Sequence, residues 1–501
     1  MPAIRVPSRA RDGRHGRGAE PAARDAGQAP APVVERAGAG RRRGGCRVTS
    51  SHRDPLIDWL YGLRGPSLKW DLDTAAAFRE VLGYPDRGLA VVHVAGTNGK
   101  GSVAAMLHAI AIEAGLDAGL FSSPHLVRPE ERIRVGRDEI DPATFRSLIG
   151  ELREIAARAL EERRLPRHPS FFEMMTAAAW LAFSRSRMRL GVFEAGLGGR
   201  LDATNVMTPM LAVITTISRD HVKTLGGSPA AIAKEKAGIV KPGVPVLLGF
   251  VSGEVREVVR RVARRRGAPL HEAAREIEIR PAGGQAWEIG TPEGVHRGIV
   301  PALPGEHQVR NAALAIRASE ILRSRGLPLP AEAAARGVAA VRWPGRLERL
   351  GTGPSFLLDA AHNEEGAAAL GTFLGRAAAP RPRRVLLFGL TEGRDAAAMF
   401  APLEGLVDGV IVTRPPVKRA QPPWRVARSL SRRRVAVEAI PEVSHALVRA
   451  RELAGPRGEV VVAGSLYLVG EVRALLTGES GPGQPRSERV PPIAASRRPV
   501  A

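Results

Sequence analysis

The chain has 501 residues, which is enough for two or three domains of roughly 100–200 residues each. Apolar residues make up 44% and charged residues 25%, the usual mix of a globular protein, so a largely disordered or fibrous chain is excluded. The sequence has no run of about 18 apolar residues and no apolar stretch typical of a signal peptide at its start. The single cysteine, Cys46, excludes an intrachain disulfide. We therefore expect a cytoplasmic protein that does not cross a membrane.

The net charge of +23 raises the question of a nucleic-acid partner. Part of this charge lies at the ends of the chain, since residues 1–53 contain 12 Arg against four acidic residues. No basic helix interleaved with aromatic residues accompanies the charge, so we do not expect nucleic-acid binding. Residues 1–50 and 477–501 are rich in Arg, Gly, Ala and Pro and lack apolar periodicity, which predicts disordered tails.

Between these tails, short apolar strands alternate with helices, beginning with two helical stretches at 54–63 and 74–82. This alternation predicts a mostly parallel sheet covered by helices on both faces. The strands predicted in the first part of the chain are 88–96, 118–121, 190–194, 211–217 and 244–248.

A second pattern begins after a β-rich stretch at 277–300 and a predicted helix at 311–325. Beyond the Trp343-Pro344-Gly345 segment, strands and helices alternate again. The strands predicted there are 356–359, 384–388, 407–413 and 459–463. We therefore predict a first domain at 51–342 and a second α/β domain at 343–476.

The segment HVAGTNGKGS, residues 93–102, lies between a predicted strand and a predicted helix at 103–114. Glycine-rich loops in this setting cradle phosphates, because small residues allow backbone N–H groups to approach the oxygens. Lys100 would add a point charge. Gly101 separates Lys100 from Ser102, so the strict spacing of a Walker A loop is not met and a plain glycine-rich turn is the alternative.

Polar residues also follow two later strands. Glu194 ends the strand at 190–194, where open α/β sheets bind ligands, and a carboxylate there can hold Mg²⁺. His221 follows the strand at 211–217, and a structural histidine, a base and a metal ligand all remain open for it. Lys236 lies in a helical stretch, and nothing in its local sequence marks it as special.

Taken together, these segments resemble the folylpolyglutamate synthase/dihydrofolate synthase family, a branch of the Mur ligase superfamily. The resemblance covers about 54–476, in the family's order. Further matching segments are SSPHLVRPEERIRV (122–135), FFEMMT (171–176), LPGEHQVRNAALA (303–315), WPGRLE (343–348), LLDAAHN (357–363) and AGSLYLVGEVR (463–473).

The resemblance implies an α/β fold: an N-terminal P-loop Mur-ligase-like ATPase domain with a mostly parallel sheet, and a smaller C-terminal Rossmann-like α/β domain. It implies an ATP-dependent ligase that adds L-glutamate to tetrahydrofolate, to dihydropteroate or to both. In such a ligase the substrate carboxylate takes the γ-phosphoryl group, and the amine of glutamate then displaces phosphate from the acyl phosphate. We expect the chain to be a monomer.

The resemblance also assigns roles to individual residues. ATP would be bound by Gly96, Thr97, Asn98, Gly99, Lys100, Gly101, Ser102, Asn311, Arg346 and Asp359. Two Mg²⁺ ions would be held by Ser123, Glu194, His221 and Lys236, where Lys236 matches a lysine that family members carbamylate. The catalytic residues would be Lys100, His221 and Lys236. Asp202 and Ala203 match positions at the pterin pocket of bifunctional members.

Two alternative functions remain at this point. A Mur-type ligase that adds an amino acid to a cell-wall precursor would share the phosphate loop, but the DATN and SSPHL segments favour a folate. A nucleotide- and nucleic-acid-binding protein with an inactive ligase site is the alternative from another class. The presence of Lys100, Glu194, His221 and Lys236 argues against such an inactive site.

Overall fold

A computed structural model describes residues 54–64, 71–218, 226–251, 253–376 and 380–479. The predicted tail at 1–50 lies outside these residues, and so does the predicted tail at 477–501 from residue 480 onward. The three sheets described below belong to one structural unit, Ser51–Ala501.

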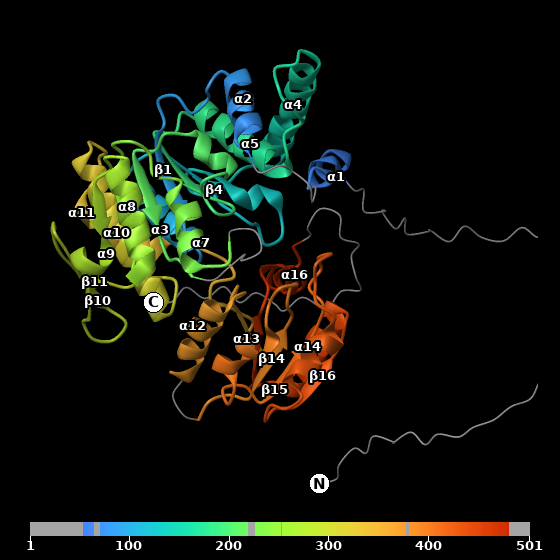
Figure 1. Ribbon diagram of the computed structural model, residues 1–501. Coiled ribbons are helices and arrows are strands. Elements are labelled where there is room, and N and C mark those ends of the chain that lie inside the picture. The colour runs from blue at the N-terminus through green and yellow to red at the C-terminus, as the bar shows by residue number, and fades with distance from the viewer. Residues whose placement is uncertain (1–53, 65–70, 219–225, 252, 377–379, 480–501) are drawn as a thin grey trace, which may run out of the picture. The chain divides into compact units, whose positions relative to one another are not determined.

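The first part of the chain forms an eight-stranded sheet, whose strands β1 and β4 are labelled in Figure 1. Its strand order is β4-β3-β2-β5-β1-β6-β7-β8. The strands from β2 to β8 in this order are parallel, whereas β3 and β4 run antiparallel at one edge. The bounds are β1 Ala90–Ala95, β2 Ala118–Phe121, β3 Ile133–Val135, β4 Asp138–Glu139, β5 Leu190–Glu194, β6 Leu211–Ile214, β7 Val246–Leu248 and β8 Leu270–Glu272.

Helices cover both faces of this sheet because alternate strand residues point to opposite sides. Val92 and Val94 of β1 pack in one core with α3, α10 and α11, whereas Val91 packs in another with α1, α4 and α5. The helices of this part are α1 Pro55–Gly62, α2 Asp73–Val81, α3 Lys100–Glu113, α4 Pro142–Glu161, α5 Phe171–Arg185, α7 Pro229–Ala237, α8 Gly253–Arg265, α9 Ala273–Glu276, α10 Glu306–Ser324, α11 Ala331–Ala340 and the 3₁₀ turns η1 Pro129–Arg132 and η2 Ala203–Val206.

The predicted β-rich stretch forms a small antiparallel sheet in the order β11-β10-β9. Its strands are β9 Glu278–Pro281, β10 Trp287–Thr291 and β11 Gly294–Ile299. Ile289 and Ile299 join the core that contains α3 and α10, so this sheet extends the large lobe, by which we mean α1 through α11 with their strands.

The C-terminal lobe, from Gly345 to the end of α16, contains a six-stranded sheet in the order β12-β13-β17-β14-β15-β16, parallel except for β12. Two cores lie on its opposite faces, one with α12 to α14 and one with α15 and α16. The bounds are β12 Glu348–Leu350, β13 Ser355–Leu358, α12 Glu364–Gly375, β14 Arg384–Phe388, α13 Ala396–Phe400, η3 Ala401–Leu403, β15 Gly409–Val412, α14 Pro423–Leu430, β16 Val437–Ala439, α15 Val443–Ala454, β17 Glu459–Ala463 and α16 Leu466–Thr477.

The predicted fold class is confirmed, while several predicted element limits were wrong. The helix predicted at 311–325 begins at Glu306, because Gly305, with a φ of 98°, turns the chain into the helix without a polar cap. The strand predicted at 211–217 ends at Ile214. The helix predicted at 103–114 begins at Lys100, so the end of the glycine-rich motif forms the first helical turn.

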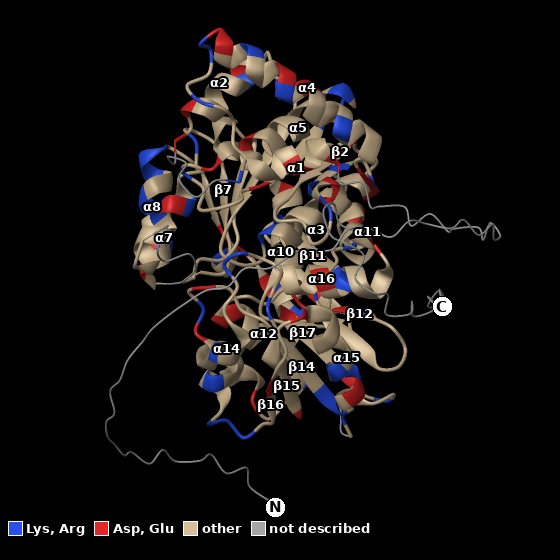
Figure 2. Ribbon diagram, turned by 90° about the vertical axis from the view of Figure 1, so that its right-hand side faces the viewer, with Lys and Arg blue, Asp and Glu red and all other residues tan. Residues whose placement is uncertain are grey.

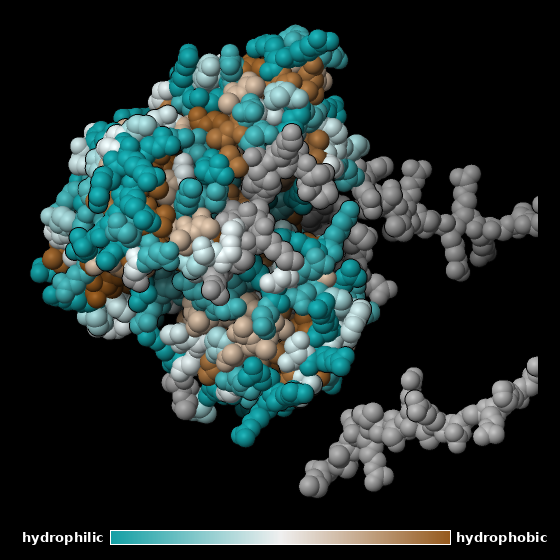
Figure 3. Space-filling view, viewed as in Figure 1, coloured by the Kyte–Doolittle hydropathy of each residue, from teal (hydrophilic) through white to brown (hydrophobic). Residues whose placement is uncertain are grey.

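The molecular surface carries both charge signs. Figure 2 shows Lys and Arg interleaved with Asp and Glu on α4 and α8. The face seen in Figure 3 is mostly hydrophilic, with separate hydrophobic areas. Among the described residues, no helix is both long and apolar enough to span a membrane.

Candidate active site

A cavity of about 800 Å³ is lined by residues of both lobes. It lies at the carboxyl ends of β1, β5 and β6, the edge where open α/β sheets bind ligands. Every predicted site residue that the structure describes lines this cavity; His221 lies outside the described residues. These lining residues are Gly96, Thr97, Asn98, Gly99, Lys100, Gly101, Ser102, Ser123, Glu194, Asp202, Ala203, Lys236, Asn311, Arg346 and Asp359.

The loop between β1 and α3 is a backbone surface that depends on glycine. Gly96 has a φ of 155°, and a Cβ there would lie 1.9 Å from Oγ1 of Thr215. Gly99 has a φ of 81°, and a Cβ there would lie 2.6 Å from Oδ1 of Asn311. The loop leads directly into α3, whose first N–H groups lack intrahelical acceptors. The loop and this helix end therefore form a site suited to phosphate oxygens.

Hydrogen bonds from the segment after β6 hold this loop in place. The amide of Thr97 donates to the carbonyl of Thr216 over 2.7 Å, and the amide of Asn98 donates to Thr216 Oγ1 over 3.0 Å. Thr215 Oγ1 donates to the Asn98 carbonyl over 2.6 Å. β6 ends at Ile214, earlier than predicted; the Thr215 amide still donates to Ala95 of β1 over 2.9 Å, while the Thr215 hydroxyl and residue 216 bind the loop.

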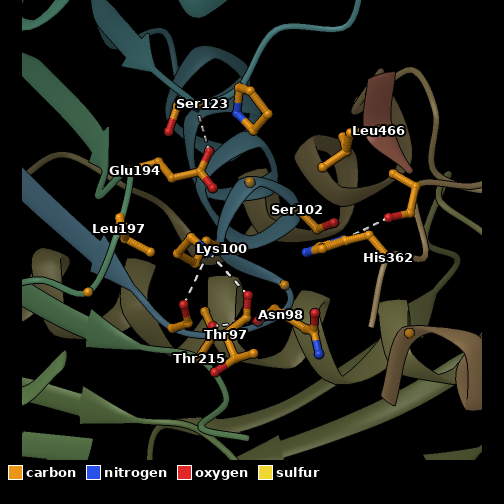
Figure 4. A pocket seen from close by; sticks show the side chains of 18 of the residues that line it. Thr97, Asn98, Lys100, Ser102, Ser123, Glu194, Leu197, Thr215, His362 and Leu466 are labelled. Carbon is orange, nitrogen blue, oxygen red and sulfur yellow. Dashed lines mark hydrogen bonds between the residues drawn. The ribbon is translucent and has the colours of Figure 1, made fainter. Parts of the chain in front are cut away.

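Two lysines donate to the same carbonyl of this loop. Lys100 Nζ lies 3.1 Å from the carbonyl oxygens of Gly96 and Thr97, as the dashed lines of Figure 4 show. Lys236, only 3% exposed and carried by α7, donates to the Gly96 carbonyl over 2.7 Å. The helix thus places a buried cation beside the loop, at a position that the family resemblance assigns to the site and that the local sequence does not mark.

Glu194 faces this cationic region from the end of β5. Its Oε2 accepts a hydrogen bond from the amide of Ser123 over 3.0 Å (Figure 4). Burial raises the pKa of Glu194, while the positive charges of Lys100 and Arg346 oppose that shift. The carboxylate can therefore bind a cation at the edge of the cavity.

The C-terminal lobe contributes Arg346 and Asp359. Both oxygens of Asp359 accept backbone hydrogen bonds, from Leu347 over 3.0 Å and from Ala361 over 2.9 Å. Burial raises the pKa of Asp359, which the neighbouring Arg346 counteracts, and burial also lowers the pKa of Arg346. Arg346 donates to the Gly345 carbonyl over 3.2 Å and lines the cavity, where its guanidinium can bind an anion.

Comparison with known proteins gives the family. A model of the Mur ligase middle domain matches residues 94–319, and a model of the Mur ligase, glutamate ligase domain matches residues 345–466. A dihydrofolate synthase/folylpolyglutamate synthase of Bacillus subtilis is 38% identical over 315 residues, which cover 62% of this chain and 73% of the relative. The chain belongs to the dihydrofolate synthase/folylpolyglutamate synthase family.

Solved structures of family members agree over more of the chain. A Mycobacterium tuberculosis folylpolyglutamate synthase complexed with ADP matches with 32% identity and a TM-score of 0.77, covering 84% of this chain and 98% of the other. Escherichia coli FolC in complex with DHPP and ADP matches with 29% identity and a TM-score of 0.74, covering 85% and 98%. The chain is thus an ATP-dependent ligase, and the cell-wall alternative is less supported because these relatives are named for folates.

In this ligase, the carboxylate predicted to meet the pterin is occupied within its own loop. Asp202 Oδ2 accepts from the amide of Leu197 over 2.9 Å, and Oδ1 accepts from the amide and hydroxyl of Thr204. The hydroxyl of Thr204 also lies 2.7 Å from Nε2 of the fully buried His93. Asp202 and Ala203 line the cavity, but these contacts make shaping of the loop a further role for Asp202.

Sequence reasoning gave no role to a cluster of cations and aromatic rings in the same cavity. The guanidinium carbon of Arg64 lies 4.2 Å from the ring centre of Tyr61 and 4.3 Å from that of Phe171. The buried Arg132 donates to Nδ1 of His125 over 2.9 Å, and burial lowers the pKa of Arg132 to about 10. His125, Arg132 and Phe171 could have been found from the sequence, because they lie in the matching segments 122–135 and 171–176. Arg64 and Tyr61 lie outside these segments.

Metal binding rests on few described side chains. Among the residues that the structure describes, no group of three or more His, Cys, Asp or Glu side chains is arranged to hold a metal ion. The predicted set of Ser123, Glu194, His221 and Lys236 contains one described carboxylate. It would thus rely on residue 221 and on the oxygens of a bound nucleotide.

Proposed function

We propose that this chain joins L-glutamate to the carboxylate of folate-type substrates, both dihydropteroate and tetrahydrofolate, and converts ATP to ADP and phosphate. The observation that supports this proposal most is the single cavity that brings together the phosphate loop, two lysines, Glu194 and the Arg346–Asp359 pair. The named relatives, one of them solved with both DHPP and ADP, support the folate-type substrate.

In the first step a carboxylate oxygen of the folate-type substrate attacks the γ-phosphorus of ATP, and ADP leaves. The barrier is the approach of one anion to another, so fixed cations and N–H donors are the main source of rate. Lys100 and Lys236, at the loop, would stabilise the transferring phosphoryl group. Arg346 would bind ATP from the C-terminal lobe.

In the second step the amine of glutamate attacks the acyl carbon, the C–N bond forms, the C–O bond to phosphate breaks, and the amine loses a proton. Several cationic side chains line the cavity and would bind the carboxylates of glutamate and of the folate tail. These are Arg64, Arg132, Arg310, Arg394 and Arg419.

Magnesium fits the residues present, since the carboxylate of Glu194 is buried, faces Lys100 and forms no ion pair with another described residue. Bound Mg²⁺ would neutralise charge on the phosphates of ATP. Ser123 and Glu194 would hold it, and a role for His221 and a second ion stay predictions. Carbamylation of Lys236 would take the place of the cationic role proposed above, because it removes the positive charge, adds anionic oxygens and leaves one N–H to donate to Gly96; ¹³C-labelled bicarbonate and carbon NMR test this modification.

The test uses the full chain with Mg-ATP, glutamate and either dihydropteroate or tetrahydrofolate, with products identified by mass. We expect dihydropteroate to gain one glutamate and tetrahydrofolate to gain further glutamates. Product from only one substrate would restrict the proposal to that reaction. Absence of product with both, while ADP still binds, would overturn it.

A further inference from the structure

Two residues of the C-terminal lobe reach across to the phosphate loop of the large lobe. Asn363 and Glu365 lie at the start of α12, where Asn363 caps the helix by accepting from the amide of Gly366 over 2.8 Å. Both side chains contact Asn98, the loop residue whose backbone is fixed by Thr215 and Thr216. The contacts connect positions about half the chain apart.

The contact with Asn363 is a reciprocal amide pair. Asn363 Nδ2 donates to Asn98 Oδ1 over 2.9 Å, and Asn98 Nδ2 lies 3.4 Å from Asn363 Oδ1. Glu365 adds a charged acceptor: its Oε2 accepts from Asn98 Nδ2 over 2.5 Å and from Ser218 Oγ over 2.7 Å. One carboxylate oxygen therefore binds the phosphate loop and the segment after β6 together.

The carboxylate of Glu365 lies in the same cavity as the phosphate loop. Glu365 is exposed and lines the same cavity as Lys100, so its negative charge by itself opposes the binding of a polyphosphate. A carboxylate at this place must therefore contribute something that offsets the repulsion. Hydrogen bonds that hold two loops in their ligand-binding arrangement before the ligand arrives lower the entropy cost of binding.

We infer that Glu365 is a positioning residue of the ligase reaction: it fastens the phosphate loop and residue 218 to α12 and keeps the ATP-binding groups of both lobes aligned. This inference rests on the proposed function for its role in turnover, but its effect on nucleotide binding can be measured without turnover. Glu365 is not proposed to contact the substrate, because its two hydrogen-bond partners are the side chains of Asn98 and Ser218.

The experiment compares Glu365→Ala with Glu365→Gln. The glutamine keeps an oxygen that accepts from both donors and removes the charge, whereas alanine removes both. Hydrogen bonds to a charged group are worth enough that we expect Glu365→Ala to weaken ADP binding roughly tenfold in calorimetry. Glu365→Gln should bind ADP at least as tightly as the wild type. If repulsion were the only effect, both variants would bind more tightly, and that result would overturn the inference.

Two further variants separate loss of the Glu365 hydrogen bonds from a nonspecific effect of substitution at the start of α12. Glu364→Ala is the matched control, since Glu364 is an exposed neighbour whose side chain makes no hydrogen bond or ion pair with another described residue. It should leave ADP binding unchanged. Ser218→Ala should weaken binding by itself and add little to Glu365→Ala, because both changes break the same contact. Fully additive effects would contradict the inference.

Turnover gives an independent readout. In Glu365→Ala the KM for ATP should rise by about the same tenfold factor while kcat stays within about twofold, because the lost contact acts on binding. One outcome is that the wild type forms no glutamylated folate while Glu365→Ala still binds ADP more weakly than Glu365→Gln. That result would overturn the proposed function and leave the role of Glu365 intact. The reverse pattern would overturn the role of Glu365 alone.

Discussion

The two lobes contribute different kinds of groups to the candidate active site. At its phosphate loop the large lobe presents backbone: the loop from Gly96 to Gly99 has no room for side chains at its glycines, and its shape is fixed by Thr215 and Thr216. The C-terminal lobe presents side chains: Asp359 accepts from the amides of Leu347 and Ala361, and Arg346 donates to the Gly345 carbonyl. We therefore expect nucleotide binding to be lost when atoms are added at the glycines of the phosphate loop. In the C-terminal lobe, we expect nucleotide binding to change with the charge and shape of the side chains.

The largest effect is expected from Gly96→Ala. The new Cβ would lie 1.9 Å from Thr215 Oγ1, at a φ of 155° that side chains rarely adopt, so the loop must move. We expect ADP binding to weaken by more than about 100-fold, because a displaced loop loses most of its phosphate contacts. Calorimetry measures this. Gly227→Ala is the control, since its Cβ meets open space, and equal binding by the two variants would refute the backbone account.

Lys236→Met tests the buried cation beside the loop. We expect kcat/KM to fall roughly 100- to 1000-fold, the loss typical for removal of a group that stabilises transition-state charge. Lys234→Met, on the exposed side of the same helix, should stay within about twofold because a solvated lysine contributes little. Steady-state kinetics with ATP as the varied substrate provides the comparison. A similar loss in both variants would mean that α7 itself, and not the Lys236 amine, is the sensitive element.

Arg346→Lys tests the side-chain account of the C-terminal lobe. Lysine keeps the charge but loses the planar fork, so we expect the KM for ATP to rise about tenfold. Arg342→Lys, an exposed change four residues earlier, is the matched control and should leave the KM unaltered. An unchanged KM in Arg346→Lys would show that only the charge matters at this position.

The smallest effect concerns stability. The folded-state pKa of Glu194 is raised by burial, so the folded protein binds its proton more tightly than the unfolded chain does. The resulting stabilisation is present at low pH and is lost as the pH rises through the raised pKa. Glu194→Gln should therefore raise the urea midpoint at pH 7, and this gain should shrink as the pH approaches the ordinary pKa of glutamate. A gain that does not change with pH would exclude the titration of Glu194 as its cause; Glu364→Gln should show no gain.

Local pattern predicted the fold well and the site in part. The strands at 118–121, 190–194, 384–388 and 459–463 coincide with β2, β5, β14 and β17, because buried parallel strands are continuous apolar runs. Gly96 and Gly99 could be predicted because a phosphate loop needs glycine at those positions. Lys236 could be singled out only through the family resemblance, because its helix has no local mark of a buried amine.

Long-range neighbours could not be predicted from one sequence. The contacts of Asn98 with Asn363 and Glu365 arise only when two sheets are assembled, and no local spacing encodes such a contact. Arg132 meets His125 because η1 and β3 turn the chain back beside β2, a path that the segment's composition does not determine. The predicted β6 limit was wrong for a related reason, since the backbone of residue 216 binds the loop at residue 97, a partner distant in sequence.

Trp343, in the linker between the lobes, lies against the start of α3. Its Nε1 is 3.1 Å from the position that a Cβ on Gly101 would occupy, and the guanidinium of Arg134 lies 5.3 Å from its ring centre. Indole emission responds to charge and solvent within such distances. One of the six tryptophans of the chain is thereby an intrinsic fluorophore beside the proposed phosphate loop, and we expect its emission to follow nucleotide binding without an added label.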